Sequence, residues 1–318
     1  MTLKCAVLDD YQQAATRFAD WTQLGDAVEL TVFPDHLDSE DALAARLAGF
    51  DAVVLMRERT PFSATLLARL PRLKLLVTTG MRNASIDLAA ARELGVAVCG
   101  TGSNPQPPAE LTWALILGLA RHLVPEANAL RDRGPWQSSI GTDLHGAVLG
   151  VLGLGKIGSQ VARVGAAFGM DVLAWSSNLT QERAADAGAR LAGSKEELLA
   201  AADVVTVHSV LSERTRGLIG AGDLALMKPT AHLVNTSRAG IVDQPALLDA
   251  LQSGRLAGAG LDVFEEEPLP AASAFRDLPN VLATPHLGYV TERNYRTFFP
   301  QVVEDIAAFL TGTPVRSL

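Results

Sequence analysis

The sequence is poor in cysteine and has no excess of basic charge, and each shortage excludes a class of protein. Two cysteines among 318 residues cannot form a disulfide framework, and no group of Cys and His residues has zinc-ligand spacing. We therefore expect a reducing, cytoplasmic compartment and no metal. The 27 basic and 35 acidic side chains give a net charge of −8, which argues against a surface for nucleic acid or for anionic membranes.

Long hydrophobic runs are also missing. Apolar stretches such as residues 111–120 are well short of the roughly 18 residues that a spanning helix needs. Asp9 and Asp10 follow a short apolar run at the start of the chain, so the N-terminus resembles a first strand rather than a signal peptide. With 48% hydrophobic and 19% charged residues over 318 positions, we expect a folded chain of two domains.

Short apolar runs alternate with helix-like stretches along the first hundred residues. The runs are KCAVLDD, VELTVF, DAVVLM, LKLLVTT and VAVCG. This rhythm predicts βαβ units, hence a parallel sheet with helices on both faces. The prolines of residues 104–108 then indicate the start of a long apolar helix, through residues 109–123, because proline is favoured in a first helical turn.

A second βαβ series begins at residue 145. Its apolar runs are HGAVLGVLGLG, MDVLAWS, DVVTVHS, TAHLVNTS, LAGAGLDVF and VLATPHLG. We therefore predict an α/β protein with two Rossmann-like domains, each with a parallel sheet. The last segment has helical periodicity that ends at Gly312, and no predicted strand follows it, so we expect this helix to pack back on the first domain.

A glycine-rich turn lies between a predicted strand and a predicted helix of the second series. Gly153, Gly155 and Gly158 have the spacing G-x-G-x-x-G. In dinucleotide-binding domains these glycines permit a tight turn, close approach of a pyrophosphate and close helix packing. Backbone N–H groups around Lys156 and Ile157 would then meet phosphate at a helix N-terminus. The context favours a bound dinucleotide over the alternative, a turn without a ligand.

The next predicted strand ends without the carboxylate that usually holds the ribose of NAD. Ser176, Ser177 and Asn178 follow it instead. The missing negative charge leaves room for NADP, yet no arginine stands at the strand end, and we expect Arg183 on a solvated helix. The predicted cofactor is therefore NAD or NADP, with the preference open.

Three residues suited to chemistry follow predicted strands in the C-terminal half: Arg238, Glu267 and His286. Taken singly, each has a simpler interpretation: Arg238 in a surface ion pair, Glu267 in a solvated acidic turn, and His286 as an ordinary loop residue. Ligands of open α/β sheets bind beyond the carboxyl ends of the strands, where all three are expected. An arginine can fix a carboxylate, an imidazole can carry a proton, and a carboxylate can orient the imidazole. With a dinucleotide they suit hydride transfer to or from a 2-hydroxy acid, and Asp262 could accept a hydrogen bond from the nicotinamide carboxamide.

At these residues the sequence resembles the D-isomer-specific 2-hydroxyacid dehydrogenase family, which includes D-3-phosphoglycerate dehydrogenases and glyoxylate/hydroxypyruvate reductases. The shared motifs span nearly the whole chain: LMRERT, TTGMRNASID, PPAELTWALIL, GAVLGVLGLGKIG, the Arg238 block, DVFEEEPLP and TPHLGY. The resemblance implies that Arg238 anchors the substrate and that His286 is the acid/base, with Glu267 as its partner. It implies further substrate contacts from the first domain, at Arg57, Gly80, Met81 and Arg82.

The resemblance also implies a discontinuous outer domain, which binds substrate, and an inserted dinucleotide-binding domain. We predict the outer domain at residues 1–101 plus 289–318 and the inserted domain at 102–288, with a homodimer built around the long helix. The implied cofactor contacts, besides the glycine turn, are Ser176, Ser177, His208, Val210, Thr215, Thr236, Asp262 and Gly288. Ser176 and Val210 depart from the family pattern, which usually has an acid and a proline there, and Arg82 and Asn83 make the substrate loop bulkier.

The leading hypothesis is an NAD(P)-dependent oxidoreductase that interconverts a small 2-oxo acid and a D-2-hydroxy acid. The alternative is a dinucleotide-sensing scaffold that resembles the related transcriptional corepressors. Formate dehydrogenase suits the residues less, because no hydroxyl proton moves in that reaction. Two side chains each have two interpretations. Arg82 either binds a second anionic group of the substrate or faces solvent. Trp136 is either an interface or pocket-lid residue, or a core aromatic.

Overall fold

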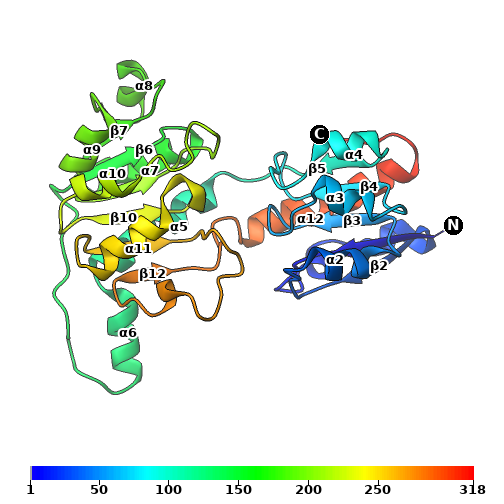
Figure 1. The fold of residues 1–318 in the computed structure, drawn as a ribbon, viewed down its shortest axis with the longest axis horizontal. Helices are drawn as coiled ribbons and strands as arrows, with labels where there is room; N and C mark the ends of the chain where they lie inside the picture. Colours follow the sequence, from blue (N-terminus) through cyan, green and yellow to red (C-terminus); the bar gives the residue numbers. More distant parts are fainter. Residues whose placement is uncertain (1) are drawn as a thin grey trace. The chain divides into compact units, whose positions relative to one another are not determined.

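The chain divides into two compact units in the computed structural model, which describes residues 2–318 (Figure 1). The outer unit combines the residues up to Asn104 with Thr291–Leu318, and the inserted unit is Pro105–Val290. The predicted domain boundaries lie three and two residues from these positions. Each unit is built on a parallel sheet. The predicted α/β class, with a discontinuous outer domain and an inserted domain, is therefore confirmed.

The outer unit holds a five-stranded sheet in the order β2-β1-β3-β4-β5, and all its strand pairs are parallel. Four strands lie within predicted apolar runs, and β1 begins one residue before its run. The strands are β1 (Leu3–Val7), β2 (Val28–Val32), β3 (Ala52–Leu55), β4 (Leu75–Thr78) and β5 (Ala97–Gly100). Every residue of β3 and β4 is buried, because parallel strands are covered on both faces.

Most helices of the outer unit begin at a side chain that accepts a backbone N–H group. Ser39, Ser63 and Asp87 cap three of them in this way. The helices are α1 (Ala15–Phe18), the 3₁₀ helix η1 (Trp21–Ala27), α2 (Glu40–Leu47), α3 (Ala64–Ala68), α4 (Leu88–Glu93) and α12 (Glu292–Leu310). The last of these returns from the far end of the chain and packs on β4 and β5, as predicted (Figure 1).

The inserted unit holds a seven-stranded parallel sheet in the order β12-β11-β10-β9-β6-β7-β8. Its strands are β6 (Val148–Leu152), β7 (Asp171–Trp175), β8 (Arg190–Leu191), β9 (Val204–Val207), β10 (His232–Asn235), β11 (Gly258–Leu261) and β12 (Val281–Ala283). Sequence analysis missed β8, because two residues form no apolar run. The order reverses between β6 and β9, which is where doubly wound sheets bind ligands.

The helices of the inserted unit depart from prediction at one place. They are α5 (Gln106–Ala120), α6 (Leu123–Arg131), α7 (Lys156–Ala167), α8 (Gln181–Asp186), α9 (Lys195–Ala201), α10 (Ala221–Leu226), η2 (Ala239–Ile241), α11 (Gln244–Gln252) and η3 (Ala274–Arg276). The long helix predicted through 109–123 ends at Ala120, because His122 takes a left-handed conformation (φ 49°). The separate α6 that follows buries none of its residues and extends away from its sheet (Figure 1).

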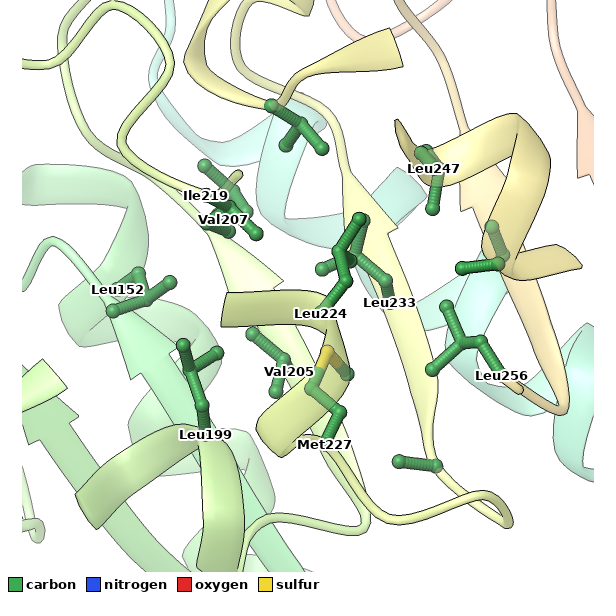
Figure 2. Close-up of a cluster of buried hydrophobic side chains, with 14 of the residues drawn as sticks. Leu152, Leu199, Val205, Val207, Ile219, Leu224, Met227, Leu233, Leu247 and Leu256 are labelled. Carbon is green, nitrogen blue, oxygen red and sulfur yellow. The ribbon is translucent and has the colours of Figure 1, made fainter. Parts of the chain in front are cut away.

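A hydrophobic core covers one face of this sheet. Figure 2 shows Val205 and Val207 of β9 and Leu233 of β10 packed under side chains such as Leu224 and Leu247 from the covering helices. Each such side chain contributes roughly 1.5–3 kcal/mol on burial, so the core fixes the strands whose carboxyl ends carry the candidate site. Within residues 2–318, no helix is both long and apolar enough to cross a membrane.

Candidate active site

The glycine-rich turn joins β6 to α7 and has one open position. Gly153 has a φ of 95°, and a Cβ there would lie 2.7 Å from the backbone nitrogen of Ser209. A Cβ on Gly158 would lie 2.0 Å from the carbonyl oxygen of Gly153. At Gly155, in contrast, no other atom lies within 4 Å of the place a Cβ would take. The first and third glycines thus allow neighbouring backbone segments to pack closely, and the second leaves its backbone open to a ligand.

The N-terminus of α7 begins at this open position. The helix starts at Lys156, and its N-cap, Gly155, has no side chain to bond the first N–H groups. Unbonded N–H groups and the positive end of the helix dipole together favour an anion. The turn and the helix start therefore fit the pyrophosphate of a dinucleotide, held by backbone N–H groups.

The end of β7 carries hydroxyl groups rather than charge. Trp175 ends the strand, and Ser176 accepts a hydrogen bond from the Leu179 N–H at its carbonyl (3.0 Å). Ser177 is exposed, and Arg183 is exposed on α8, as predicted. The strand end thus lacks the acid that would repel a 2′-phosphate.

Arg238, Glu267 and His286 follow three neighbouring strands. Their strands β10, β11 and β12 lie side by side, with Asn235 in register with Leu261 and Leu261 in register with Ala283. The three predicted residues thus leave the same edge of the sheet. The Nδ1 atom of His286 lies 2.6 Å from Oε2 of Glu267.

The surroundings of Glu267 keep its carboxyl ionised. Burial opposes ionisation, but the pKa of Glu267 is lowered overall. The lowering comes from the hydrogen bond to His286 and the charge of that ring, from the Phe264 N–H (2.8 Å) and from the charge of Arg238. A carboxylate at this distance from Nδ1 stabilises a protonated imidazole. Because Nδ1 faces Glu267, Nε2 is the nitrogen left to exchange a proton with a ligand.

Asp262 holds the turn that carries His286. Its fully buried carboxylate accepts the Thr284 hydroxyl (2.7 Å) and the N–H groups of Leu287 (2.7 Å) and Gly288 (2.9 Å). Burial raises the pKa of Asp262, and these donors oppose the rise. His286 has a left-handed backbone (φ 51°), which the bonds on either side stabilise. Sequence analysis missed this positioning role, and the contact with a nicotinamide carboxamide stays a prediction.

Arg238 leaves its strand through a compact turn. The Asn235 amide donates to the Arg238 carbonyl (3.0 Å), and Asn235 Oδ1 accepts the Ser237 N–H (3.0 Å). The Ser237 hydroxyl donates to the carbonyl of Ser209 (2.6 Å), which ties this turn to the one after β9. The half-buried Arg238 is thereby held at the edge where it lowers the pKa of Glu267.

The other residues implied as cofactor contacts follow β9 and β10. Burial lowers the pKa of His208 to about 3, and its neutral ring lies 2.9 Å from the Thr206 hydroxyl. The Thr215 hydroxyl donates to the carbonyl of Val210 (2.6 Å), whose side chain is exposed. Thr236 is buried. All lie beyond the carboxyl ends of strands, although contact with a cofactor stays a prediction.

Two turns of the outer unit bring together the residues expected to bind substrate. Arg57 follows β3 with a φ of 57°, and its N–H and Nη1 donate to the hydroxyl and carbonyl of Thr79 (2.9 Å each). Gly80 has a φ of 102°, and a Cβ there would lie 1.7 Å from Nη1 of Arg57. Met81 and Arg82 are exposed on the same turn. Arg57 thus lies against Gly80, and a side chain at position 80 would displace its guanidinium.

Asn83 and Thr101 connect these turns, a role that the sequence did not predict. The Asn83 amide donates to the carbonyl of Arg57 (2.7 Å) and to the Thr78 hydroxyl (2.9 Å), and the Thr101 hydroxyl accepts the N–H of Gly80 (2.9 Å). The available signal was their position after apolar strands, with Thr101 directly after β5 and Asn83 in the turn that follows β4. For Trp136 the core interpretation is wrong, since 78% of its surface is exposed.

Comparison with known proteins gives consistent matches. The family model described as "D-isomer specific 2-hydroxyacid dehydrogenase, NAD binding domain" matches residues 113–288. The D-3-phosphoglycerate dehydrogenase of Bacillus subtilis is 39% identical over 283 residues, which cover 88% of this chain and 52% of that protein. The glyoxylate reductase of Aeropyrum pernix is 39% identical over 257 residues, covering 78% of this chain and 76% of that protein.

Solved structures match over nearly the full length. A phosphoglycerate oxidoreductase from Vibrio cholerae superposes with a TM-score of 0.91 at 39% identity, covering 98% of this chain and 100% of that one. The pyruvate reductase of Chlamydomonas reinhardtii gives a TM-score of 0.83 at 29% identity, covering 98% of each chain. The chain spans about half the length of the D-3-phosphoglycerate dehydrogenases that it matches. It belongs to the D-isomer-specific 2-hydroxyacid dehydrogenase family.

Proposed function

We propose that this protein is an NAD(P)-dependent oxidoreductase that interconverts a small 2-oxo acid and the D-2-hydroxy acid. The observation that carries the proposal is the 2.6 Å contact between His286 Nδ1 and Glu267 Oε2. It lies at the carboxyl edge of a sheet whose glycine turn fits a dinucleotide. Arg238, at the same edge, is the cation that would bind a substrate carboxylate.

Each residue has one task in the reducing direction. The nicotinamide cofactor, when bound, supplies the hydride. Arg238 fixes the substrate carboxylate and so orients the neighbouring carbonyl group. His286, protonated and paired with Glu267, donates the proton on Nε2 to the carbonyl oxygen, and Glu267 stabilises the imidazolium before that transfer.

The dinucleotide is held by the glycine turn and the strand end after it. We assign the pyrophosphate to the N–H groups of residues 153–158, namely Gly153, Gly155, Lys156, Ile157 and Gly158, and the adenosine ribose to Ser176 and Ser177. Because no carboxylate follows β7, both NADH and NADPH are expected to bind. The contacts expected at His208, Val210, Thr215, Thr236 and Gly288 belong to the same proposal.

The outer unit contributes substrate contacts in this proposal, through Arg57, Gly80, Met81 and Arg82. Support comes from the packing of Arg57 against Gly80, which places a cation beside a glycine-centred turn at the carboxyl edge of the outer unit's own sheet.

The two cysteines, Cys5 and Cys99, are free and buried, which suits the cytoplasm as the compartment.

A homodimer is the assembly that we propose. The segment from α6 onward exposes large apolar side chains, which a second copy would cover: Leu123, Val124, Leu130, Trp136 and Ile140. A hollow lined by Leu119, Val124 and Leu282, among others, lies beside α6 and would take part in this contact. Sedimentation at micromolar concentration tests the dimer, and a monomer would contradict it.

The test of the activity follows the absorbance of NADH or NADPH with glyoxylate, hydroxypyruvate, pyruvate and 2-oxoglutarate. We expect turnover of at least one acid, and the ratio between cofactors measures the effect of Ser176. Cofactor binding without turnover of these or bulkier oxo acids would overturn the proposal. That outcome would point to a scaffold, for which no described residue gives independent support.

A further inference from the structure

One carboxylate of the outer unit connects three separate turns at the carboxyl edge of its sheet. Asp9 follows β1 and is 1% exposed, with a left-handed backbone (φ 56°). Its Oδ1 lies 2.7 Å from Nδ1 of His36, on the turn between β2 and α2. Its Oδ2 accepts the hydroxyl of Thr60, on the turn between β3 and α3 (2.5 Å). Strands β2, β1 and β3 are adjacent in the sheet, so Asp9 lies in the turn after the middle strand of the three.

The turn after β3 is held by Asp9 a second time. Nη1 of Arg59 donates to the backbone carbonyl of Asp9 (2.7 Å). The guanidinium of Arg59 also lies over the ring of Tyr11, 4.5 Å from its centre. Two consecutive residues of this turn, Arg59 and Thr60, are therefore anchored to the turn after β1.

The same turn carries Arg57 at its other end. Arg57 has a left-handed backbone and is bonded to Thr79 and Asn83, as described above. A left-handed arginine persists only where its surroundings hold it. The turn thus has two supports: Thr79 and Asn83 on one side, and Asp9 on the other. Loss of either support lets the backbone of Arg57 relax toward its ordinary conformations.

His36 reinforces the second support. Its ring is nearly buried, with Asp9 on Nδ1 and Asp38 3.4 Å from Nε2. The hydrogen bond that His36 donates to Asp9 raises the pKa of His36, while burial and the nearby charge of Arg59 act against the rise. Asp9, Asp38 and Arg59 are the charged groups that act on the ring. A charge-assisted bond of this kind is stronger than a neutral one, so it restrains the Asp9 carboxylate firmly.

We propose that the His36–Asp9 pair is a positioning device for substrate binding: it fixes Arg59 and Thr60 and thereby presents Arg57 to the anionic group of the oxo acid. This inference rests on the proposed function. Neither residue of the pair touches reacting atoms, so its loss changes how the oxo acid binds rather than how the proton moves.

The test compares variants of Asp9 and His36 with variants of Thr60, whose hydroxyl donates to Asp9. Asp9→Asn and His36→Gln are expected to raise the KM for the oxo acid about tenfold, equivalent to about 1.4 kcal/mol of binding. Their kcat and their KM for the cofactor should stay within about twofold, since the proton-transfer groups are untouched. Thr60→Val removes the hydroxyl and should act like Asp9→Asn, whereas Thr60→Ser keeps the hydroxyl and should restore the normal KM.

Asp51 provides a matched control at the other end of β3. It is also buried (5% exposed) and bonded, since it accepts the Lys4 N–H (3.1 Å) and pairs with Arg72 (3.1 Å). Asp51→Asn should cost comparable stability and leave the KM for the oxo acid unchanged. If Asp9→Asn and Asp51→Asn lower stability alike and neither changes that KM, the pair is merely structural and the inference is wrong.

A binding measurement separates this inference from the proposed function. Oxalate resembles an oxo acid but cannot be reduced, so its affinity reports substrate binding without turnover. A normal chain that binds oxalate but reduces no oxo acid would overturn the proposed function, and weaker oxalate binding by Asp9→Asn would still support positioning. A chain that turns over oxo acids, with equal KM and oxalate affinity in Asp9→Asn, overturns the inference alone. A chain that neither binds oxalate nor reduces oxo acids overturns both.

Discussion

The imidazole of His286 meets the carboxylate of Glu267 across 19 residues of sequence, with 2.6 Å between Nδ1 and Oε2. The contact forms because β11 and β12 are neighbours in the sheet, so that the turns leaving their carboxyl ends lie side by side. Asp262, one residue after β11, bonds the turn after β12 and fixes the approach of the ring. The contact between His286 and Glu267 is therefore a product of strand order.

Replacement of His286 tests its role as the acid. His286→Gln removes the proton carrier but retains a polar side chain of similar size. We expect turnover to fall by roughly 100- to 10,000-fold, the usual contribution of a general acid. Cofactor affinity, followed by NADH fluorescence, should change little because the glycine turn is untouched. Near-normal turnover in this variant would refute the acid/base assignment.

Substitution of Gly80 tests whether its turn in the outer unit binds substrate, as proposed. In Gly80→Ala the new Cβ would meet Nη1 of Arg57 at 1.7 Å, so the guanidinium must move. We expect the KM for the oxo acid to rise about tenfold while cofactor affinity is unchanged. Gly95→Ala is the control, because Gly95 also has a positive φ (72°) but no atom lies within 4 Å of its Cβ. Both variants carry roughly 1–2 kcal/mol of backbone strain. Equal KM values in the two would argue against a role for Arg57.

Gly155 separates cofactor binding from folding. The Cβ of Gly155→Ala would enter open space and its backbone is unstrained (φ −84°), so the thermal midpoint should stay unchanged. The added methyl group would occupy the approach to the N-terminus of α7, and NADH affinity should fall about tenfold or more. Gly158→Ala should instead lower the thermal midpoint, because its Cβ lies 2.0 Å from the Gly153 carbonyl. Unchanged NADH affinity in Gly155→Ala would mean that the pyrophosphate binds elsewhere.

Ser176 tests the cofactor preference. Ser176→Asp places a negative charge at the end of β7, where it would bond ribose hydroxyls and repel a 2′-phosphate. We expect the ratio of kcat/KM with NADPH to kcat/KM with NADH to fall about tenfold. Asn178→Asp adds the same net charge two residues away and should change the ratio less. An equal change in both variants would show a general charge effect.

The pH dependence of stability tests the His36–Asp9 pair without any substrate. Because the folded pKa of His36 is raised, its contribution to stability is fully present below the unfolded pKa of about 6.5 and is lost as pH rises through the folded value. Urea unfolding of the normal chain and of His36→Gln should therefore differ more at pH 6 than at pH 9. His232 is the opposite case, since burial lowers its pKa. The free energy of unfolding of the unmodified protein should therefore rise relative to that of His232→Gln as the pH rises.

Much of this protein was predictable from local sequence. Apolar runs located every strand except β8, because burial on both faces of a parallel sheet requires a continuous apolar segment. The prolines at the start of α5 and the spacing of Gly153, Gly155 and Gly158 marked two helix starts, since those residues act on their own backbone. Arg238, Glu267 and His286 were found because each follows a strand, and the carboxyl ends of parallel strands form one edge.

Only the tertiary structure decided which residues meet at those edges. Asp9 and Asp10 stood after a strand in the same way as Arg238, yet nothing local indicated that Asp9 would bond His36, 27 residues away, and Thr60, 51 residues away. The break at His122 likewise opposes a helical pattern that continues through it. Periodicity reports which face of an element is buried, a property of neighbouring residues. Contacts between turns depend on strand order, which is set by the packing of the whole sheet.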